Sequence, residues 1–294
     1  MAPLGCAPLG QAPPGRPRPL LGSMIPTWLS DLATLRDRDL AAEGLVVAEG
    51  RLAAERLIAR SAIEAYEPLA LLATPGAAEN LEVFDSRAGL AARWPFFVAS
   101  EAELSELAGF PFHRGIIAIA MRPPPLHAEA LAETMAGRGL PPLLVLPRTR
   151  DPENLGALAR SAAALGFGGM LLGPPCPDFL SRRALRVSMG AVLAMPCARL
   201  GSPEAWKAFA SRGYALAGAV IDQGATEAAA WEPRAPCALA LGDEYAGLDQ
   251  AWLAVCDEKI TIAMAMGPDS LNVAAAGAIL MWRASLAAAR GPLA

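Results

Sequence analysis

The alternation of apolar strands and helical segments in the C-terminal half is the feature that most constrains the fold of this chain. LLVLP, from Leu143 to Pro147, is a fully apolar run of the kind found in parallel sheets, and a helix is predicted to begin at Asp151 and Pro152. Further strands are predicted at GGMLL, YALAGAVI, CALALG and KITI, with loops and helices between them. This order predicts an α/β fold with a doubly wound parallel sheet, which binds ligands at the carboxyl ends of its strands.

A smaller set of strands and helices precedes this sheet. LVVAEG, from Leu45, predicts a buried strand, and RLAAERLIARS after it predicts an amphipathic helix. Three more strands are predicted at PLALLAT, PFFVAS and GIIAIAM, and Ser100 with Glu103 forms the capping-box pattern of a short helix. The pattern predicts a small α/β domain that ends near Arg122.

Composition divides the chain into four parts. Residues 1–23 are rich in Pro and Gly, which predicts a flexible tail and makes Met24 a second candidate start. Residues 24–122 then form the smaller domain, and residues 141–294 form the domain with the parallel sheet. Prolines bracket the segment between them, residues 123–140, which is predicted to be a linker that includes one short helix.

Charge and cysteine content exclude several classes of protein. A net charge of −4 argues against a protein that grips nucleic acid by bulk electrostatics. The five cysteines are scattered and lack a CxxC pair, so neither a disulfide framework nor a metal site is predicted, and reduced thiols in the cytoplasm are the simplest interpretation. The start of the chain lacks a secretory pattern, and Arg283 interrupts the best apolar stretch, so no membrane span is predicted.

Polar and small residues gather at three predicted strand ends. Asn154 and Arg160 follow LLVLP, GDEYAGL follows CALALG, and a loop leading to Ser270-Leu271-Asn272 follows KITI, with Ser270 where the N-cap of the last helix is expected. Because these strand ends meet at one edge of a parallel sheet, a pocket is predicted there. Between residues 141 and 190, six arginines outnumber three acidic residues, which predicts a basic rim for phosphate contacts.

The three motifs DPENLGALARSAAALGF, LGDEYAGL and ITIAMAMGPDSLNVAAAGAIL, in this order, together resemble the SpoU/TrmH family of RNA ribose methyltransferases in the SPOUT superfamily. RVSMGAV and the N-terminal RDRDL, VVAEG and GFPFHRG are similar to the members that carry an extra N-terminal domain related to ribosomal RNA-binding proteins. With that domain, the resemblance covers nearly everything after Met24.

The resemblance implies a sheet whose C-terminal segment is threaded into a trefoil knot, an obligate homodimer, and an RNA-binding N-terminal domain. It also implies S-adenosylmethionine as the methyl donor and a ribose 2′-hydroxyl of ribosomal or transfer RNA as the acceptor. The cofactor contacts carried over by position are Leu241, Gly242, Ile262, Met264 and Leu271. The catalytic residues carried over are Asn154, Arg160, Glu244, Ser270 and Asn272.

Arg160 corresponds to the residue that the family usually assigns to activation of the hydroxyl. Methyl transfer depends mainly on alignment, which supplies about 7–11 kcal/mol, and on loss of the hydroxyl proton. A guanidinium, with a pKa above about 12, is a poor base. We therefore hypothesise that Arg160 clamps the neighbouring phosphate and stabilises alkoxide charge, while phosphate or water takes the proton.

Each of these polar residues also has a purely structural interpretation. Arg160 can be an exposed helix charge, Asn154 a side chain that bonds the backbone at a helix start, and Glu244 the cap of the next helix. Ser270 and Asn272 can simply cap the last helix. The family's usual Pro and Gly in the final loop are Ala263 and Met266 here, and Asp243 replaces the commoner Asn, which puts cofactor binding in some question.

Two other functions remain open from the sequence. Base methylation needs a carboxylate at a ring nitrogen, whereas the first motif offers Asn154 and Arg160. A non-catalytic RNA-binding or ribosome-assembly protein on the same fold is disfavoured because the polar site residues are all present. A dinucleotide-binding dehydrogenase is excluded more firmly, since no GxGxxG opens either domain's first helix.

Overall fold

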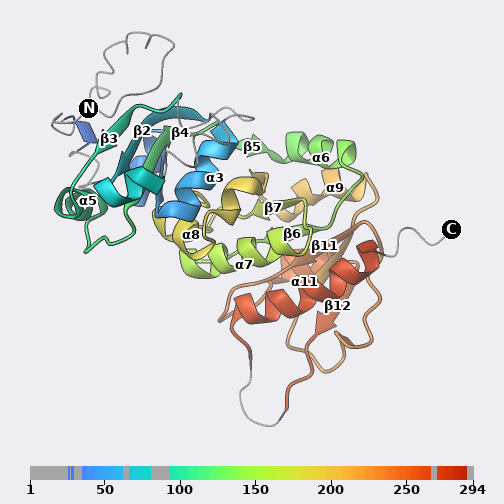
Figure 1. Ribbon diagram of the computed structural model, residues 1–294. Helices are drawn as coiled ribbons and strands as arrows, with labels where there is room; N and C mark the ends of the chain where they lie inside the picture. The colour runs from blue at the N-terminus through green and yellow to red at the C-terminus, as the bar shows by residue number, and fades with distance from the viewer. Residues whose placement is uncertain are drawn as a thin grey trace.

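The computed structural model describes residues 26, 28–29, 35–61, 66–80, 93–265 and 270–289, without the side chains of residues 287–289. The predicted tail and Met266 lie outside these residues. The described chain forms two sheets flanked by helices (Figure 1), so the predicted α/β class is confirmed. None of the helices in these ranges is long and apolar enough to cross a membrane.

The smaller sheet has four strands in the order β1-β4-β2-β3. β4 pairs antiparallel with both β1 and β2, and β2 pairs parallel with β3. Ser100 and Glu103 form the predicted capping box, in which the Glu103 carboxylate accepts the Ser100 N–H at 2.7 Å. The elements are β1 (Leu45–Glu49), β2 (Glu67–Ala73), β3 (Phe96–Val98), β4 (Ile116–Met121), α2 (Asp37–Ala42), α3 (Arg51–Ser61) and α5 (Glu101–Ala108).

The larger sheet is parallel throughout, with eight strands in the order β10-β12-β9-β11-β6-β7-β8-β5. All five strands predicted for it form. Three others were missed because they are only two or three residues long, too short for a hydrophobic period. The strands are β5 (Leu126–His127), β6 (Leu143–Leu146), β7 (Gly169–Leu172), β8 (Cys197–Arg199), β9 (Ala215–Ala219), β10 (Thr226–Glu227), β11 (Cys237–Ala240) and β12 (Glu258–Thr261).

Helices cover both faces of the larger sheet, which explains why its strands are apolar without alternation. In β6, Leu144 and Leu146 belong to the core beneath α7 and α11, whereas Leu143 and Val145 belong to the core beneath α6, α9 and α10. The helices are α6 (Ala128–Gly137), α7 (Pro152–Ala164), α8 (Arg182–Val187), α9 (Lys207–Ala210), α10 (Gln250–Val255), α11 (Val273–Ala289) and the 3₁₀ helices η2 (Ala191–Ala194) and η3 (Pro203–Trp206).

The segment that we predicted to be a linker, residues 123–140, contains β5 and α6. β5 pairs with β8 at the edge of the larger sheet. The apolar face of α6, with Leu131, Ala132 and Met135, is fully buried in the second core. These residues therefore extend the layers of the larger sheet, and the segment contributes to the core.

The two sheets share one hydrophobic core. Residues of β1 and α3 are buried together with η2 and α7. Gly190 has a left-handed φ of 78°, and a Cβ added there would lie 2.9 Å from Ala53 Cα, so the backbones approach closely. Arg182 donates from Nη2 to the Leu35 carbonyl at 2.7 Å and pairs with Asp37 at 3.2 Å. The smaller sheet is thus held against α8 and η2 of the larger one.

Candidate functional site

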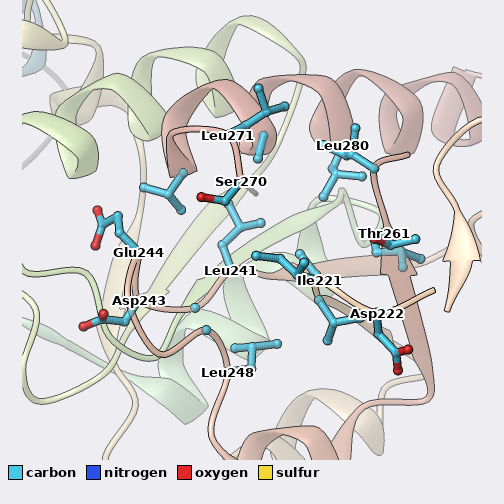
Figure 2. A pocket seen from close by; sticks show the side chains of 18 of the residues that line it. Ile221, Asp222, Leu241, Asp243, Glu244, Leu248, Thr261, Ser270, Leu271 and Leu280 are labelled. Carbon is cyan, nitrogen blue, oxygen red and sulfur yellow. The ribbon is translucent and has the colours of Figure 1, made fainter. Parts of the chain in front are cut away.

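A cavity of about 490 Å³ lies at the carboxyl ends of β9, β11 and β12, where the sequence predicts a pocket. We call it the strand-end cavity; Figure 2 shows it from close by. Its walls come from the loop after β9, the loop after β11, the loop after β12 and the first turns of α11. Apolar side chains such as Leu241, Leu248 and Leu280 form much of the lining, and Asp222, Asp243, Glu244 and Lys259 supply the charges.

The loop after β11, GDEYAGL, is folded tightly around Gly242. A Cβ at this position would lie 2.1 Å from the Gly247 carbonyl carbon, so no other residue fits without moving the backbone. Asp243 and Gly247 exchange two backbone hydrogen bonds, of 3.1 and 2.8 Å. The motif's glycines are therefore explained by the shape of the loop.

The Asp243 carboxylate organises the same loop. Its Oδ1 accepts the backbone N–H groups of Tyr245 at 2.8 Å and Ala246 at 3.3 Å, and its Oδ2 lies 3.2 Å from Arg150 Nε. The hydrogen bond from Tyr245 is the main reason why the pKa of Asp243 is lowered, and Arg150 and Arg148 lower it further. The departure at Asp243 thus adds an ion pair to the turn.

Three side chains from the three motifs form one hydrogen-bonded chain. Asn272 donates from Nδ2 to Asn154 Oδ1 at 3.1 Å, and Asn154 donates from Nδ2 to Glu244 Oε1 at 2.5 Å. Asn272 Oδ1 accepts the Ala274 N–H at 2.9 Å, which orients its amide. The Glu244 carboxylate is therefore held at the edge of the cavity, with Asp222 at the opposite end (Figure 2).

The five residues predicted to contact the cofactor all line the strand-end cavity. Leu241 is buried, whereas Met264 and Leu271 keep 37% and 38% of their surface exposed. Large apolar side chains that stay exposed at a cavity are available to contact a ligand. Their role in cofactor binding remains a prediction.

Ser270 also lines the cavity, but it does not cap the last helix. Helix α11 begins at Val273, so the N-cap position belongs to Asn272, whose Oδ1 accepts the N–H groups of Ala274 and Ala275. The expected N-cap at Ser270 is wrong, because the loop continues for two more residues. The helix-cap alternative for Glu244 is wrong as well, since Asp249 caps α10 by accepting the Trp252 N–H at 3.0 Å.

Arg160 does not reach the cavity of its own chain. It is exposed on α7, and it is absent from the lining. Six residues of helix place it about 9 Å along α7 from Asn154 and roughly a third of a turn around the axis. The neighbouring Leu158 and Ala159 are fully buried, so the helix presents Arg160 to the outside.

Sequence reasoning missed the contribution of β9 to the site. Ile221 and Asp222 line the cavity from the loop after this strand, and Ile221 is 78% exposed. Thr261, at the end of β12, lines the same end of the cavity. The strand-end rule that we applied to three strands points equally to the fourth, YALAGAVI, whose last residue precedes Asp222.

The cavity can hold one small molecule. Its volume falls within the range of about 300–1,000 Å³ that is typical of ligand sites. Apolar walls suit a planar or aliphatic part of a ligand, while carboxylates at both ends suit cationic or hydroxyl groups.

Comparisons with known proteins agree on one family. The family model described as the SpoU rRNA Methylase family matches residues 141–282. An uncharacterized tRNA/rRNA methyltransferase of Mycobacterium bovis is 36% identical over 244 residues, covering 82% of this chain and 80% of that protein. The 23S rRNA (guanosine-2′-O-)-methyltransferase RlmB of Acinetobacter baylyi is 27% identical over 188 residues, 63% of this chain and 76% of that protein. An AdoMet-bound rRNA methyltransferase from Sinorhizobium meliloti shares the fold, with a TM-score of 0.73 at 21% identity over 92% of this chain and 97% of that one.

Proposed function

Because the chain belongs to the SpoU rRNA methylase family, we propose that it transfers a methyl group from S-adenosylmethionine to a ribose 2′-hydroxyl of ribosomal or transfer RNA. The observation that carries this proposal is the chain of hydrogen bonds from Asn272 through Asn154 to Glu244, which joins the three motifs beside the strand-end cavity. The protein is therefore an enzyme of the family predicted from its sequence, and we propose that it acts in the cytoplasm.

S-adenosylmethionine supplies an activated methyl group on a positively charged sulfonium. The residues around the cavity fit such a molecule, because Asp222, Asp243 and Glu244 give it negative charge and the loops after β11 and β12 offer apolar walls and backbone groups. We propose that its contacts are those implied by the resemblance, namely Leu241, Gly242, Ile262, Met264 and Leu271, all of which line the cavity.

The polar chain positions Glu244 for the reaction. Asn154 donates one amide hydrogen to the carboxylate and accepts one from Asn272, so the Asn154 amide is held from both sides and orients the carboxylate. Ser270, exposed at the cavity, is placed to hydrogen-bond the ribose. Phosphate or water accepts the proton of the 2′-hydroxyl, as hypothesised from the sequence.

We propose that Arg160 contributes to the strand-end cavity of a second copy of the chain. On α11, the exposed residues Ala275, Ile279 and Trp282 are spaced four and three residues apart and form an apolar stripe, with Trp282 55% exposed. Figure 1 shows α11 beside α7, which carries Arg160. A homodimer that buries this stripe would bring Arg160 to the partner's site, where its planar guanidinium clamps an RNA phosphate.

We also propose that the last helix completes a trefoil knot. A Cβ added at Gly277 would lie 2.4 Å from Leu158 Cδ2 and 2.8 Å from Leu241 Cδ1, so α11 lies closely against α7 and the end of β11. Close approach of this kind is what a helix threaded past neighbouring segments requires. The smaller sheet and its helices are proposed to bind the RNA substrate.

The direct test is to incubate the purified protein with S-adenosylmethionine and the stable RNA of a strain in which its gene is deleted. After nuclease digestion, mass spectrometry should find a new 2′-O-methylnucleoside. A new base-methylated nucleoside would instead support the base-methylation alternative. Calorimetry with S-adenosylmethionine tests the remaining alternative, since a non-catalytic RNA-binding protein is expected to show no binding.

A further inference from the structure

A second cavity, of about 430 Å³, lies where the two sheets meet. We call it the junction cavity. Arg60 and Tyr66 reach it from the smaller sheet's side, Arg138 from the end of α6, and Asp178, Phe179 and Arg199 from the loops around β7 and β8. The segment that joins the two sheets, from Arg122 to Leu126, forms another wall. The cavity therefore exists only when both parts of the chain are packed together.

The junction cavity carries an excess of positive charge. Among the residues that the structure describes, four arginines line it against one carboxylate, Asp178. That carboxylate is already occupied, because Arg122 Nη1 lies 2.9 and 2.8 Å from its two oxygens. Arg199 donates to three backbone carbonyls, those of Gly173, Cys176 and Pro177, which hold its guanidinium in place without neutralising it.

Two more arginines stand near each other in this cavity. Burial lowers the pKa of Arg60, and the positive charge of Arg138 lowers it further, while Tyr66 opposes the shift. Arg138 is exposed and forms no ion pair with any carboxylate of the described residues. Arg138 can therefore bind an anion that enters the cavity.

We propose that the junction cavity binds a phosphate-bearing nucleotide unit of the RNA, with its phosphate on Arg138 and its base against Tyr66 and Phe179. This proposal rests on the proposed function. Guanidinium groups bind phosphate in a planar, bidentate way, and aromatic side chains receive unstacked bases of single-stranded RNA. The volume of the cavity exceeds that of a phosphate alone, which favours a whole nucleotide.

The position of the junction cavity fits one RNA chain that reaches both cavities. β8 borders the junction cavity and β11 borders the strand-end cavity, with β6 and β7 between them. Three interstrand steps of about 4.8 Å amount to about 14 Å. At a rise of about 3.4 Å per nucleotide in a stacked strand, this corresponds to about four nucleotides. The junction cavity would thus fix the register of the RNA relative to the methylated ribose.

The test compares Arg138→Gln with Arg51→Gln in the full chain. Arg51 is also exposed, but its charge is paired with Glu55 at 2.6 Å on the same helix, so the control removes the same formal charge outside the cavity. Binding of a fluorescein-labelled 20-nucleotide RNA hairpin is measured by anisotropy at several salt concentrations. Arg138→Gln should weaken binding about tenfold and reduce the salt slope by about 0.7, the effect of one phosphate contact on a single strand. Arg51→Gln should change neither, and both variants should bind S-adenosylmethionine like the parent protein.

Titration with adenosine monophosphate and with inorganic phosphate distinguishes the sources of the phosphate. If these small ligands bind in an Arg138-dependent way while RNA affinity is unchanged, the RNA assignment is overturned in favour of a free nucleotide. Unchanged RNA affinity and salt slope with no small-ligand binding overturn the site altogether. Either result leaves the methyltransferase proposal intact, which fails separately if S-adenosylmethionine does not bind the parent protein.

Discussion

The strand-end cavity and the junction cavity have similar volumes, about 490 and 430 Å³, but opposite charge. Asp222, Asp243 and Glu244 line the first beside one lysine, with Asp243 paired to Arg150, whereas four arginines line the second beside Asp178, which is paired to one of them. A cationic sulfonium is attracted to the first set and an RNA phosphate to the second. The difference shows how an acidic chain can bind nucleic acid. Its arginines are concentrated where we propose that the RNA backbone lies, while the strand-end cavity stays acidic.

The largest effect is expected for Asn154→Ala, which affects only the strand-end cavity. It removes the donor to Glu244 and the acceptor of Asn272, so the carboxylate is no longer held. Loss of positioning of this kind lowers kcat by about 100-fold. Steady-state kinetics should show this fall in kcat with little change in KM for RNA, because the junction cavity is untouched.

Asn80→Ala is the matched control for this variant. Asn80 also donates from its side-chain amide, to the Gly76 carbonyl at 3.0 Å, but it is exposed and lies in the smaller sheet's part of the chain. Its kcat should equal that of the parent. A normal kcat for Asn154→Ala would show that the hydrogen-bonded chain is structural and takes no part in positioning.

Gly242→Ala is expected to affect cofactor binding next most strongly. The added Cβ would collide with the Gly247 and Leu248 backbone, and overpacking of this kind costs about 1–3 kcal/mol, equivalent to about 5–150-fold in affinity. Calorimetry should show weaker S-adenosylmethionine binding, with unchanged affinity for the labelled RNA. Gly201→Ala serves as control, because a Cβ there meets nothing within 4 Å. Normal cofactor affinity in Gly242→Ala would mean that the ligand does not depend on this loop.

How much of this could be predicted from the sequence differs between the two cavities. The strand-end cavity is built from motifs and strand ends, so the sequence predicts its lining after β11 and β12 but not Ile221 and Asp222 after β9. The hydrogen bonds between Asn154, Glu244 and Asn272 were not predictable, because they join positions 90 and 118 residues apart and depend on how the loops pack.

The junction cavity shows the opposite case. Arg60, Arg138 and Arg199 lie in unrelated segments, and no local pattern connects them. The prolines that bracket residues 123–140 are typical of a domain boundary and therefore predict a linker. The structure shows that the apolar face of α6, within this segment, is buried against the larger sheet. Proline content reports where a helix or strand cannot continue, but it does not report whether the segment between two prolines has an apolar face to bury.

Arg160→Lys tests the arginine that lies in neither cavity of its own chain. The substitution keeps the positive charge but removes the planar guanidinium group. We therefore expect kcat to fall about tenfold, the effect of losing one charge-assisted hydrogen bond. The affinity for S-adenosylmethionine should be unchanged. Arg51→Lys, which alters an exposed helix arginine in the same way, should keep normal turnover. Near-normal turnover of Arg160→Lys would refute the need for bidentate phosphate contact.

The smallest effect is expected for Asp243→Asn, which restores the residue more common in the family. An Asn keeps an oxygen for the N–H groups of Tyr245 and Ala246 but loses the ion pair with Arg150. The pKa of Asp243 is lowered by folding, so its carboxylate stabilises the folded state above the unfolded pKa of about 3.9, and this stabilisation is lost as pH falls through the lowered pKa. The variant should therefore unfold more easily than the parent at pH 7, by about 1 kcal/mol, and this difference should shrink as the pH falls through the lowered pKa of Asp243.

Thermal denaturation across this pH range measures the difference, with Asp222→Asn as a control from the exposed loop after β9. A stability difference for Asp243→Asn that does not change with pH would contradict the role of its charge. If the difference does vanish in acid, then the negative end of the strand-end cavity holds its own loop together as well as attracting the ligand. In the junction cavity, by contrast, Arg122 and Asp178 provide the structural pairing, and Arg138 is the residue that we propose for the RNA phosphate.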